Sequence, residues 1–152
     1  MFNGRSEEYS EKILKNNGFW ADIPIKEFQL QRAIPLQIPQ EMIEAALIES
    51  MLGVSLELIT VAENYRLKGV QHVSEIPSIL TQGLQQNYQT ILYKKAVYAR
   101  AKAILIPEFA TLSAREIHEK REYIEEQKSL EAEAVQAIRL LKGKKRGSVC
   151  LI

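Results

Sequence analysis

The sequence is poor in the residues that build covalent cross-links and metal sites. Its 152 residues include one cysteine, Cys150, and two histidines, His72 and His118. A single cysteine excludes an intramolecular disulfide and a cysteine-based zinc cluster. His118-Glu119 begins like a zinc-protease motif, but Glu122 stands where the second histidine ligand would fall. We therefore expect no metal ion and no cofactor.

Long apolar runs and an excess of one charge are also missing. The longest apolar stretches, such as 103–107, are far shorter than the roughly 20 residues that cross a bilayer. Residues 1–15 lack the apolar core of a secretory signal. The 20 basic and 19 acidic residues give a formal net charge of +1, so no global attraction draws the chain to nucleic acid or to a membrane. These absences predict a cytoplasmic protein without a membrane partner, whose charges act locally.

Catalytic patterns are absent as well. The sequence has no glycine-rich phosphate loop and no nucleophile elbow around its serines. Several glutamates crowd one predicted helix, but a charge-laced helix surface leaves each carboxylate in water and does not separate their pKa values. The sequence therefore predicts that the protein is not an enzyme.

The N-terminal part of the chain is predicted to lack a stable helix. Residues 1–18 are polar and predict a flexible, weakly ordered arm or a fraying helix. Pro24, Pro35 and Pro39 predict an extended stretch over 19–39, because proline disfavours helix at itself and at the residue before it. This stretch packs either onto the protein's own core or onto a neighbouring subunit, and the sequence leaves both open.

Helical periodicity begins after Pro39. Apolar residues recur at one-turn spacing over 40–52, and Gly53 is expected to interrupt this first helix. Ser55 is expected to cap a second helix that Gly69 closes. A long connection that buries part of its own apolar side chains follows over 70–83.

Two longer helices complete the predicted fold. The third runs from about Tyr88 to Ile106, where Pro107 ends or kinks it, and its buried face is rich in alanine, which favours a close helix partner. The fourth begins at a capping box, Ser113-Ala-Arg-Glu116, and reaches about Leu141. We therefore expect an all-α fold, a bundle of about four helices with its domain over residues 19–141.

Charge is distributed unevenly between these two helices. The third helix carries Lys94, Lys95 and Lys102 within a narrow arc and has no acid between Leu84 and Ile106. Over residues 113–141 the fourth helix has five basic and seven acidic residues, a net charge of −2. Opposite charges can pair within one hairpin or across a subunit boundary, and the three lysines can instead face DNA or solvent. The sequence leaves each of these interpretations open.

Residues 142–152 form a tail of distinct composition. Lys142, Lys144, Lys145 and Arg146 are followed by the apolar run Val149, Cys150, Leu151 and Ile152. Cys150 is third from the end, whereas a prenylated cysteine is fourth from the end, so the tail does not match a lipidation signal. An apolar strand without a partner in its own chain is suited to docking on another protein.

The order of these features resembles a known family. Six segments carry the resemblance: Phe-Trp-Ala-Asp-Ile at 19–23, the helix at 40–52, Asn64-Tyr-Arg66 with Gly69, Val73-Ser-Glu-Ile-Pro77, Tyr93-Lys-Lys-Ala-Val97, and the end from Gly143-Lys-Lys-Arg146 to Ile152. Together they resemble the phage head completion protein (GPL) family of temperate contractile-tailed bacteriophages, over about residues 19–152. Residues 1–18 depart from the Pro/Gly-rich arm often found in that family, so no role is carried over to them.

The resemblance implies a helical head-tail adaptor of the virion, assembled in the host cytoplasm. Such proteins form a ring on the portal protein after DNA packaging and extend the DNA channel, where they contact packaged DNA non-specifically. The ring presents a surface to a downstream connector or tail-terminator protein. Related adaptors insert a C-terminal segment into the portal, which implies portal docking by Val149, Cys150, Leu151 and Ile152. Lys144, Lys145 and Arg146 would then meet portal acids or DNA, and Lys94, Lys95 and Lys102 would meet the channel or another copy.

A second class of function stays open beside the adaptor. The basic residues of the third helix and of the tail also suit a small helical DNA-binding or regulatory module. The net charge of +1 speaks against this alternative, because dedicated DNA-binding domains usually carry a larger positive excess.

Overall fold

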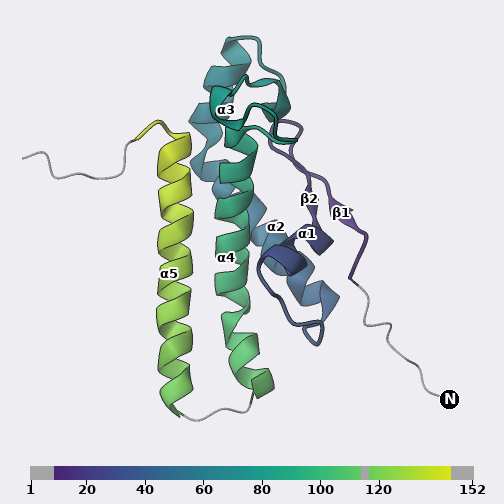
Figure 1. Cartoon of the computed structure of the whole chain (residues 1–152), viewed down its shortest axis with the longest axis vertical. Coiled ribbons are helices and arrows are strands. Elements are labelled where there is room, and N and C mark those ends of the chain that lie inside the picture. Colours follow the sequence, from purple (N-terminus) through teal and green to yellow (C-terminus); the bar gives the residue numbers. More distant parts are fainter. Residues whose placement is uncertain (1–8, 114–116, 145–152) are drawn as a thin grey trace, which may run out of the picture.

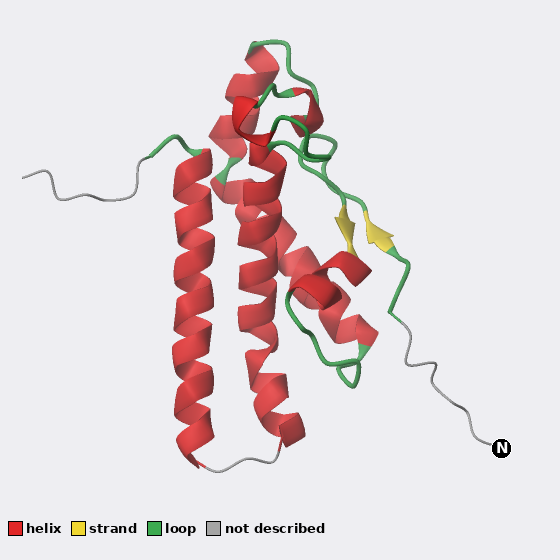
Figure 2. Ribbon diagram, in the orientation of Figure 1, coloured by secondary structure: helices red, strands yellow, loops and turns green. Residues whose placement is uncertain are grey.

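The computed structural model describes residues 9–113 and 117–144. Helices dominate this part of the chain, beside one small two-stranded sheet (Figure 2). The elements are β1 (Ile13–Leu14), β2 (Ile23–Pro24), α1 (Ile25–Gln31), α2 (Gln40–Glu57), α3 (Ile59–Leu67), the short 3-10 turns Val73–Glu75 and Ile79–Thr81, α4 (Tyr88–Ser113) and α5 (Ile117–Leu141). The expected all-α class is confirmed.

The two longest helices, α4 and α5, lie side by side as an antiparallel hairpin, and α2 packs on α4 from another side (Figure 1). Small residues line the hairpin contact: Ala99 and Ala103 of α4 and Ala134 of α5 are buried with Ile106 and Leu130. Because an alanine leaves little between two helix backbones, these positions allow a close approach. The predicted alanine-lined contact between the two helices is confirmed.

Pro107 lies inside α4 and does not end it, since the helix continues to Ser113. Proline has no N–H to donate to the carbonyl four residues earlier, which here belongs to Ala103. The side-chain amide of Gln127 in α5 donates a hydrogen bond to that carbonyl oxygen at 2.9 Å. The neighbouring helix therefore satisfies the group that the proline leaves unpaired. Ser113 is the last described residue of α4, and the other three residues of the predicted capping box, 114–116, lie outside the described residues.

The predicted boundary between the first two helices at Gly53 and Ser55 is wrong. The helix α2 runs through both residues to Glu57, and the chain bends by 60° before α3. Tertiary contacts explain the continuation: a Cβ on Gly53 would lie 3.7 Å from the Arg100 guanidinium, and the Ser55 hydroxyl lies 2.9 Å from the Tyr93 hydroxyl. At the other end Gly69 has a φ of +88°, as predicted for a C-terminal glycine.

The stretch 19–39 is not extended throughout, because α1 occupies Ile25–Gln31. Pro24 precedes this helix directly, where its missing N–H costs nothing, and the next proline is Pro35. Phe28 and other apolar side chains of the stretch are buried in the protein's own core. Of the two alternatives for this stretch, packing onto its own core is the one observed.

Part of the segment predicted as an arm lies against the domain. Ile13 and Leu14 pair with β2, and Leu14 is buried. The Asn16 side-chain amide donates to the Ala21 carbonyl and to the Tyr93 hydroxyl, both at 2.8 Å. Residues 9–17 thereby connect to α4. The boundary predicted at residue 18 stays a prediction.

Candidate interaction surface

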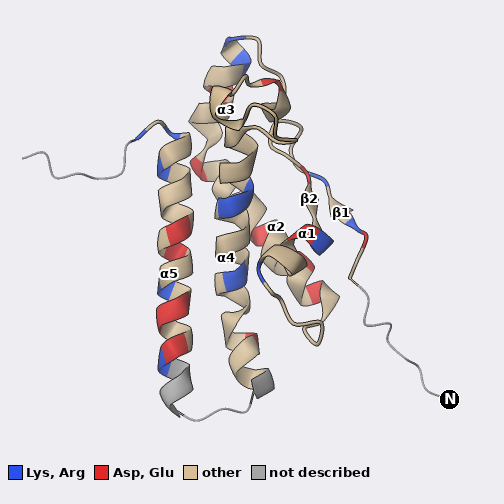
Figure 3. Ribbon diagram, in the orientation of Figure 1, with Lys and Arg blue, Asp and Glu red and all other residues tan. Residues whose placement is uncertain are grey.

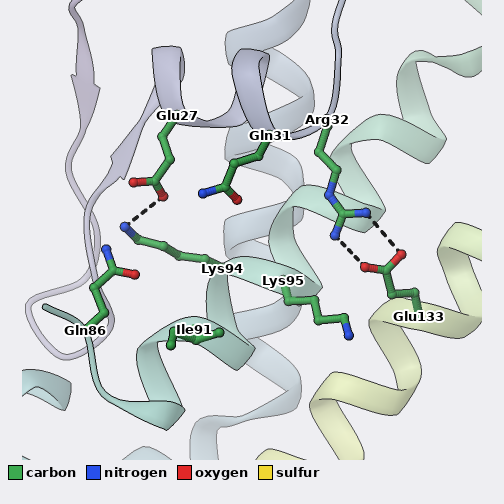
Figure 4. A pocket seen from close by; sticks show the side chains of 8 residues that line it. All are labelled: Glu27, Gln31, Arg32, Gln86, Ile91, Lys94, Lys95 and Glu133. Atoms are coloured by element: carbon green, nitrogen blue, oxygen red, sulfur yellow. Dashed lines mark hydrogen bonds and ion pairs between the residues drawn. The ribbon is translucent and has the colours of Figure 1, made fainter. Parts of the chain in front are cut away.

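A charged hollow of about 430 Å³ lies where α1 faces α4 and α5 (Figure 4). Two of the three lysines predicted to meet DNA or another copy line it. Its lining residues are Glu27, Gln31, Arg32, Gln86, Ile91, Lys94, Lys95 and Glu133. In the hollow, Lys94 and Lys95 therefore lie near the carboxylates Glu27 and Glu133 of the same chain.

Lys94 is enclosed by its own chain. It is 7% exposed, and its Nζ lies 2.9 Å from Oε1 of Glu27 in α1. The Tyr98 hydroxyl donates to the same oxygen at 2.7 Å. Burial and the Glu27 carboxylate raise the pKa of Tyr98, so its hydroxyl remains a donor. Lys94 is thus a structural ion-pair partner, with its charge directed to α1.

Arg32 and Glu133 form the second ion pair of the hollow and connect the end of α1 to α5. Arg32 Nη1 and Nη2 reach the two carboxylate oxygens of Glu133 at 3.1 and 2.5 Å. The hydrogen bonds from Arg32, with the nearby charges of Arg32, Lys95 and Lys102, lower the pKa of Glu133. Lys95 itself is exposed at the rim of the hollow.

Two further basic residues of α4, Arg100 and Lys102, pair with carboxylates of α2 and α5. Lys102 Nζ lies 3.3 Å from Glu126 Oε1, and Arg100 lies between Glu57 of α2, at 2.5 Å, and Glu131 of α5, at 3.9 Å. Figure 3 shows acidic bands along α5 facing a basic α4. These charges therefore pair within the chain, Lys102 inside the α4–α5 hairpin and Arg100 mainly with α2. Among the three predicted lysines, Lys95 presents the most accessible charge.

Four of the segments that carried the family resemblance, 19–23, 64–66, 73–77 and 93–97, meet in the core. Trp20 stacks on Tyr93 with ring centroids 4.8 Å apart and planes within 2° of parallel. Phe19 lies against Tyr65, at 6.1 Å, and beneath the Arg66 guanidinium, at 5.4 Å. The Val73 N–H donates to the Phe19 carbonyl at 2.9 Å. These segments therefore pack against one another in one part of the core.

Most of the predicted docking tail lies outside the described residues. Lys145, Arg146, Val149, Cys150, Leu151 and Ile152 belong to the part that the structure does not describe. Lys144 is described: it is exposed, and its N–H donates to the Arg139 carbonyl at the end of α5. The prediction that this tail docks on a partner stays a prediction.

Sequence reasoning missed an apolar surface on the outer side of α2. Four large side chains there are exposed, and we call them the α2–α3 stripe: Ile48 at 45%, Leu52 at 68%, Leu56 at 70% and Ile59 at 51%. Their spacing of three to four residues is visible in the sequence. It went unseen because the helix was predicted to end at Gly53, which divides the stripe between two elements.

The described residues contain no cluster of metal-ligating side chains and no single helix that could span a membrane. Within ranges 9–113 and 117–144 no three histidine, cysteine, aspartate or glutamate side chains are grouped so that they could hold a metal ion. In the same ranges, no single helix is long and apolar enough to cross a membrane.

Comparison with known proteins identifies the family. The model of the family described as phage head completion protein (GPL) matches residues 14–152. The chain is similar to the "Probable head completion/stabilization protein" of Haemophilus phage HP1 (strain HP1c1), with 60% identity over 152 residues that cover all of both chains. No solved structure gives a significant match.

Proposed function

This chain belongs to the phage head completion protein (GPL) family, and from that membership we propose that it is a head-tail adaptor. Members of this family have a structural role in assembly of the phage head, so the protein is a virion component that contacts other head or tail components. In our proposal, copies assembled in the host cytoplasm form a ring on the portal protein after DNA packaging. The ring extends the DNA channel and offers a surface to the next connector or tail-terminator protein.

The observation that supports this proposal is that carboxylates of the same chain neutralise most basic residues of α4. Lys94, Arg100 and Lys102 all have carboxylate partners within the chain. A nearly neutral rod can lie beside copies of itself without the repulsion that a strongly basic surface would create. It also suits the wall of a channel through which DNA must pass, because phosphate contacts would slow the DNA.

The alternative of a DNA-binding module loses much of its predicted surface. Lys94 is buried against Glu27, and Lys102 pairs with Glu126. DNA would have to displace these carboxylates before it gained either lysine. Lys95 and the basic tail remain, which is few phosphate contacts for a dedicated binder.

Co-sedimentation with the portal ring of the same phage tests the proposal. We expect the full chain to sediment with portal rings in a fixed ratio, and to remain bound at salt concentrations that remove non-specific DNA binding. The control is the chain with duplex DNA alone, for which we expect weak binding that falls steeply with salt. Tight DNA binding without portal binding would contradict the adaptor and favour the DNA-binding module.

A further inference from the structure

The helix α2 is apolar on two opposite sides. One side, with Ile43, Leu47 and Val54, is buried in the core. The other side carries the α2–α3 stripe, whose residues point away from that core because they lie about half a turn from the buried set. A helix that is apolar all round is normally covered on all sides. The stripe is therefore a surface that needs a cover.

The surroundings of the stripe are acidic. The helix α2 contains four glutamates and no lysine or arginine. Glu41 lies before the stripe, Glu49 beside it and Glu63 one turn after it, and all three are exposed. Within the described part of the chain none of these three has an ion-pair partner. The matching surface must combine apolar side chains with positive charge.

One segment of this same sequence has that composition. Residues 142–152 place Lys144, Lys145 and Arg146 directly before the apolar run 149–152. Four extended residues span about 13 Å, and the part of the stripe on α2, from Ile48 to Leu56, is about 12 Å long. We propose that the α2–α3 stripe of one copy receives residues 144–152 of a neighbouring copy, the apolar run on the stripe and the basic residues beside Glu49 and Glu63.

Chain length favours a neighbouring copy over the segment's own chain. The eight residues 145–152 span at most about 26–29 Å. The apolar run on the stripe uses about 13 Å of this, which leaves about 13–16 Å to pass around α2 to its outer side. A helix with side chains is about 10–12 Å across, so half its circumference takes up all of that remainder. A second copy can instead present its stripe where the segment leaves α5.

This contact would connect copies head to tail. The stripe and the segment are different surfaces of one chain, so each copy would offer one to the copy before it and the other to the copy after it. Contacts of this kind close into rings when the rotation between copies allows it. The inference thus rests on the proposed ring and names the contact that joins its subunits.

The single cysteine makes the contact directly testable. One chain carries Leu52→Cys and Cys150→Ser, and it is mixed with a size-tagged chain that keeps Cys150. Diamide oxidises neighbouring thiols to a disulfide, and a non-reducing gel detects the heterodimer. The mixture is oxidised as free protein at high concentration and again on portal rings. We expect at least roughly tenfold more heterodimer than with a matched control, because a docked segment experiences a millimolar effective concentration.

The control carries Ala132→Cys and Cys150→Ser, since Ala132 is exposed on α5 and lies outside the stripe. Charge reversal adds a second readout: Glu49→Lys with Glu63→Lys should lower the heterodimer yield several-fold, and Lys145→Glu with Arg146→Glu in the other chain should restore it.

Three results would overturn the inference. Equal yields from Leu52→Cys and Ala132→Cys, including none from either, would mean that the stripe does not receive the segment. In a chain that keeps Cys150, closure of Leu52→Cys onto its own Cys150 without heterodimer would assign the stripe to the same chain. If portal rings protect Cys150 from a thiol reagent, free protein does not, and no heterodimer forms on the rings, the segment binds the portal. Failure to sediment with portal would contradict the adaptor, while heterodimer formation in free protein would still support the contact.

Discussion

The positive charge of Lys94 stabilises the protein's own fold through an ion pair with Glu27. Its side chain is 9% exposed and that of its partner Glu27 is 26% exposed. Burying a charge is costly unless it is paired and hydrogen-bonded, and here the Tyr98 hydroxyl supplies a further hydrogen bond to Glu27. The pair connects α1 to α4 and helps to fix the position of that short helix.

Lys94→Met should therefore destabilise the protein. It keeps much of the side-chain volume but leaves Glu27 without its cation, and we expect a loss of roughly 1–3 kcal/mol in the free energy of unfolding. Urea denaturation measures it. Lys95→Met is the matched control, because Lys95 is the exposed neighbour, and its expected effect is below about 0.5 kcal/mol. Equal effects of the two substitutions would contradict the structural role of Lys94.

Glu133 should make stability depend on pH on the acid side. Its pKa in the folded protein is held below the ordinary value of 4.5 by the Arg32 hydrogen bonds. A lowered pKa contributes stability above the unfolded-state value, and this contribution is lost as pH falls through the folded-state pKa. Between about pH 6 and pH 3, the natural protein should lose roughly 1 kcal/mol more stability than Glu133→Gln. Parallel pH profiles in urea denaturation would refute this assignment.

At the scale of elements, local signals predicted the helices where their apolar period was long. The alanine face of α4 and the glycine that closes α3 could be read from the sequence. The boundary between α2 and α3 could not be read from the sequence, because Gly53 lies beside the Arg100 side chain and the Ser55 hydroxyl is hydrogen-bonded to the Tyr93 hydroxyl. Both partners are distant in sequence. The helix α1 was missed because the prolines around it leave just enough residues for two turns.

Between α5 and α4, the Gln127 side chain donates the hydrogen bond to the Ala103 carbonyl that Pro107 cannot donate. Gln127→Leu should cost roughly 1–2 kcal/mol, because it leaves the Ala103 carbonyl without a donor. In a Pro107→Ala background the backbone N–H at that position returns, so the same substitution should cost close to nothing. A double-mutant cycle in urea denaturation measures the coupling. Additive effects would mean that Gln127 does not compensate for the proline.

On the scale of the whole molecule, the core has two parts. The main cluster joins residues from Leu14 to Leu141, and a smaller one along the hairpin joins Ala99, Ala103 and Ile106 with Leu130 and Ala134. The hairpin extends beyond the body formed by the N-terminal elements (Figure 1). The class of the fold could be predicted from the sequence, whereas the exposed stripe on α2 required knowledge of which side of that helix is buried.

Removing residues 148–152 should leave the fold intact. Every residue of both core clusters lies between Leu14 and Leu141. We expect the truncated chain to melt within about 2 °C of the full chain, which corresponds to less than about 1 kcal/mol for a protein of this size. Circular dichroism measures the melting temperature. A large decrease would mean that the segment packs against its own core.

The stacking of Trp20 on Tyr93 also bears on how the protein is made. Tyr93 lies 73 residues after Trp20, so at ribosomal rates of about 5–20 residues per second it is added roughly 4–15 seconds later. Before α4 is complete, the apolar side chains of β1, β2, α1 and α2 have no α4 to pack on. Nascent chains on neighbouring ribosomes are exposed to one another during this interval, and the native contacts with α4 form only after α4 leaves the ribosomal tunnel.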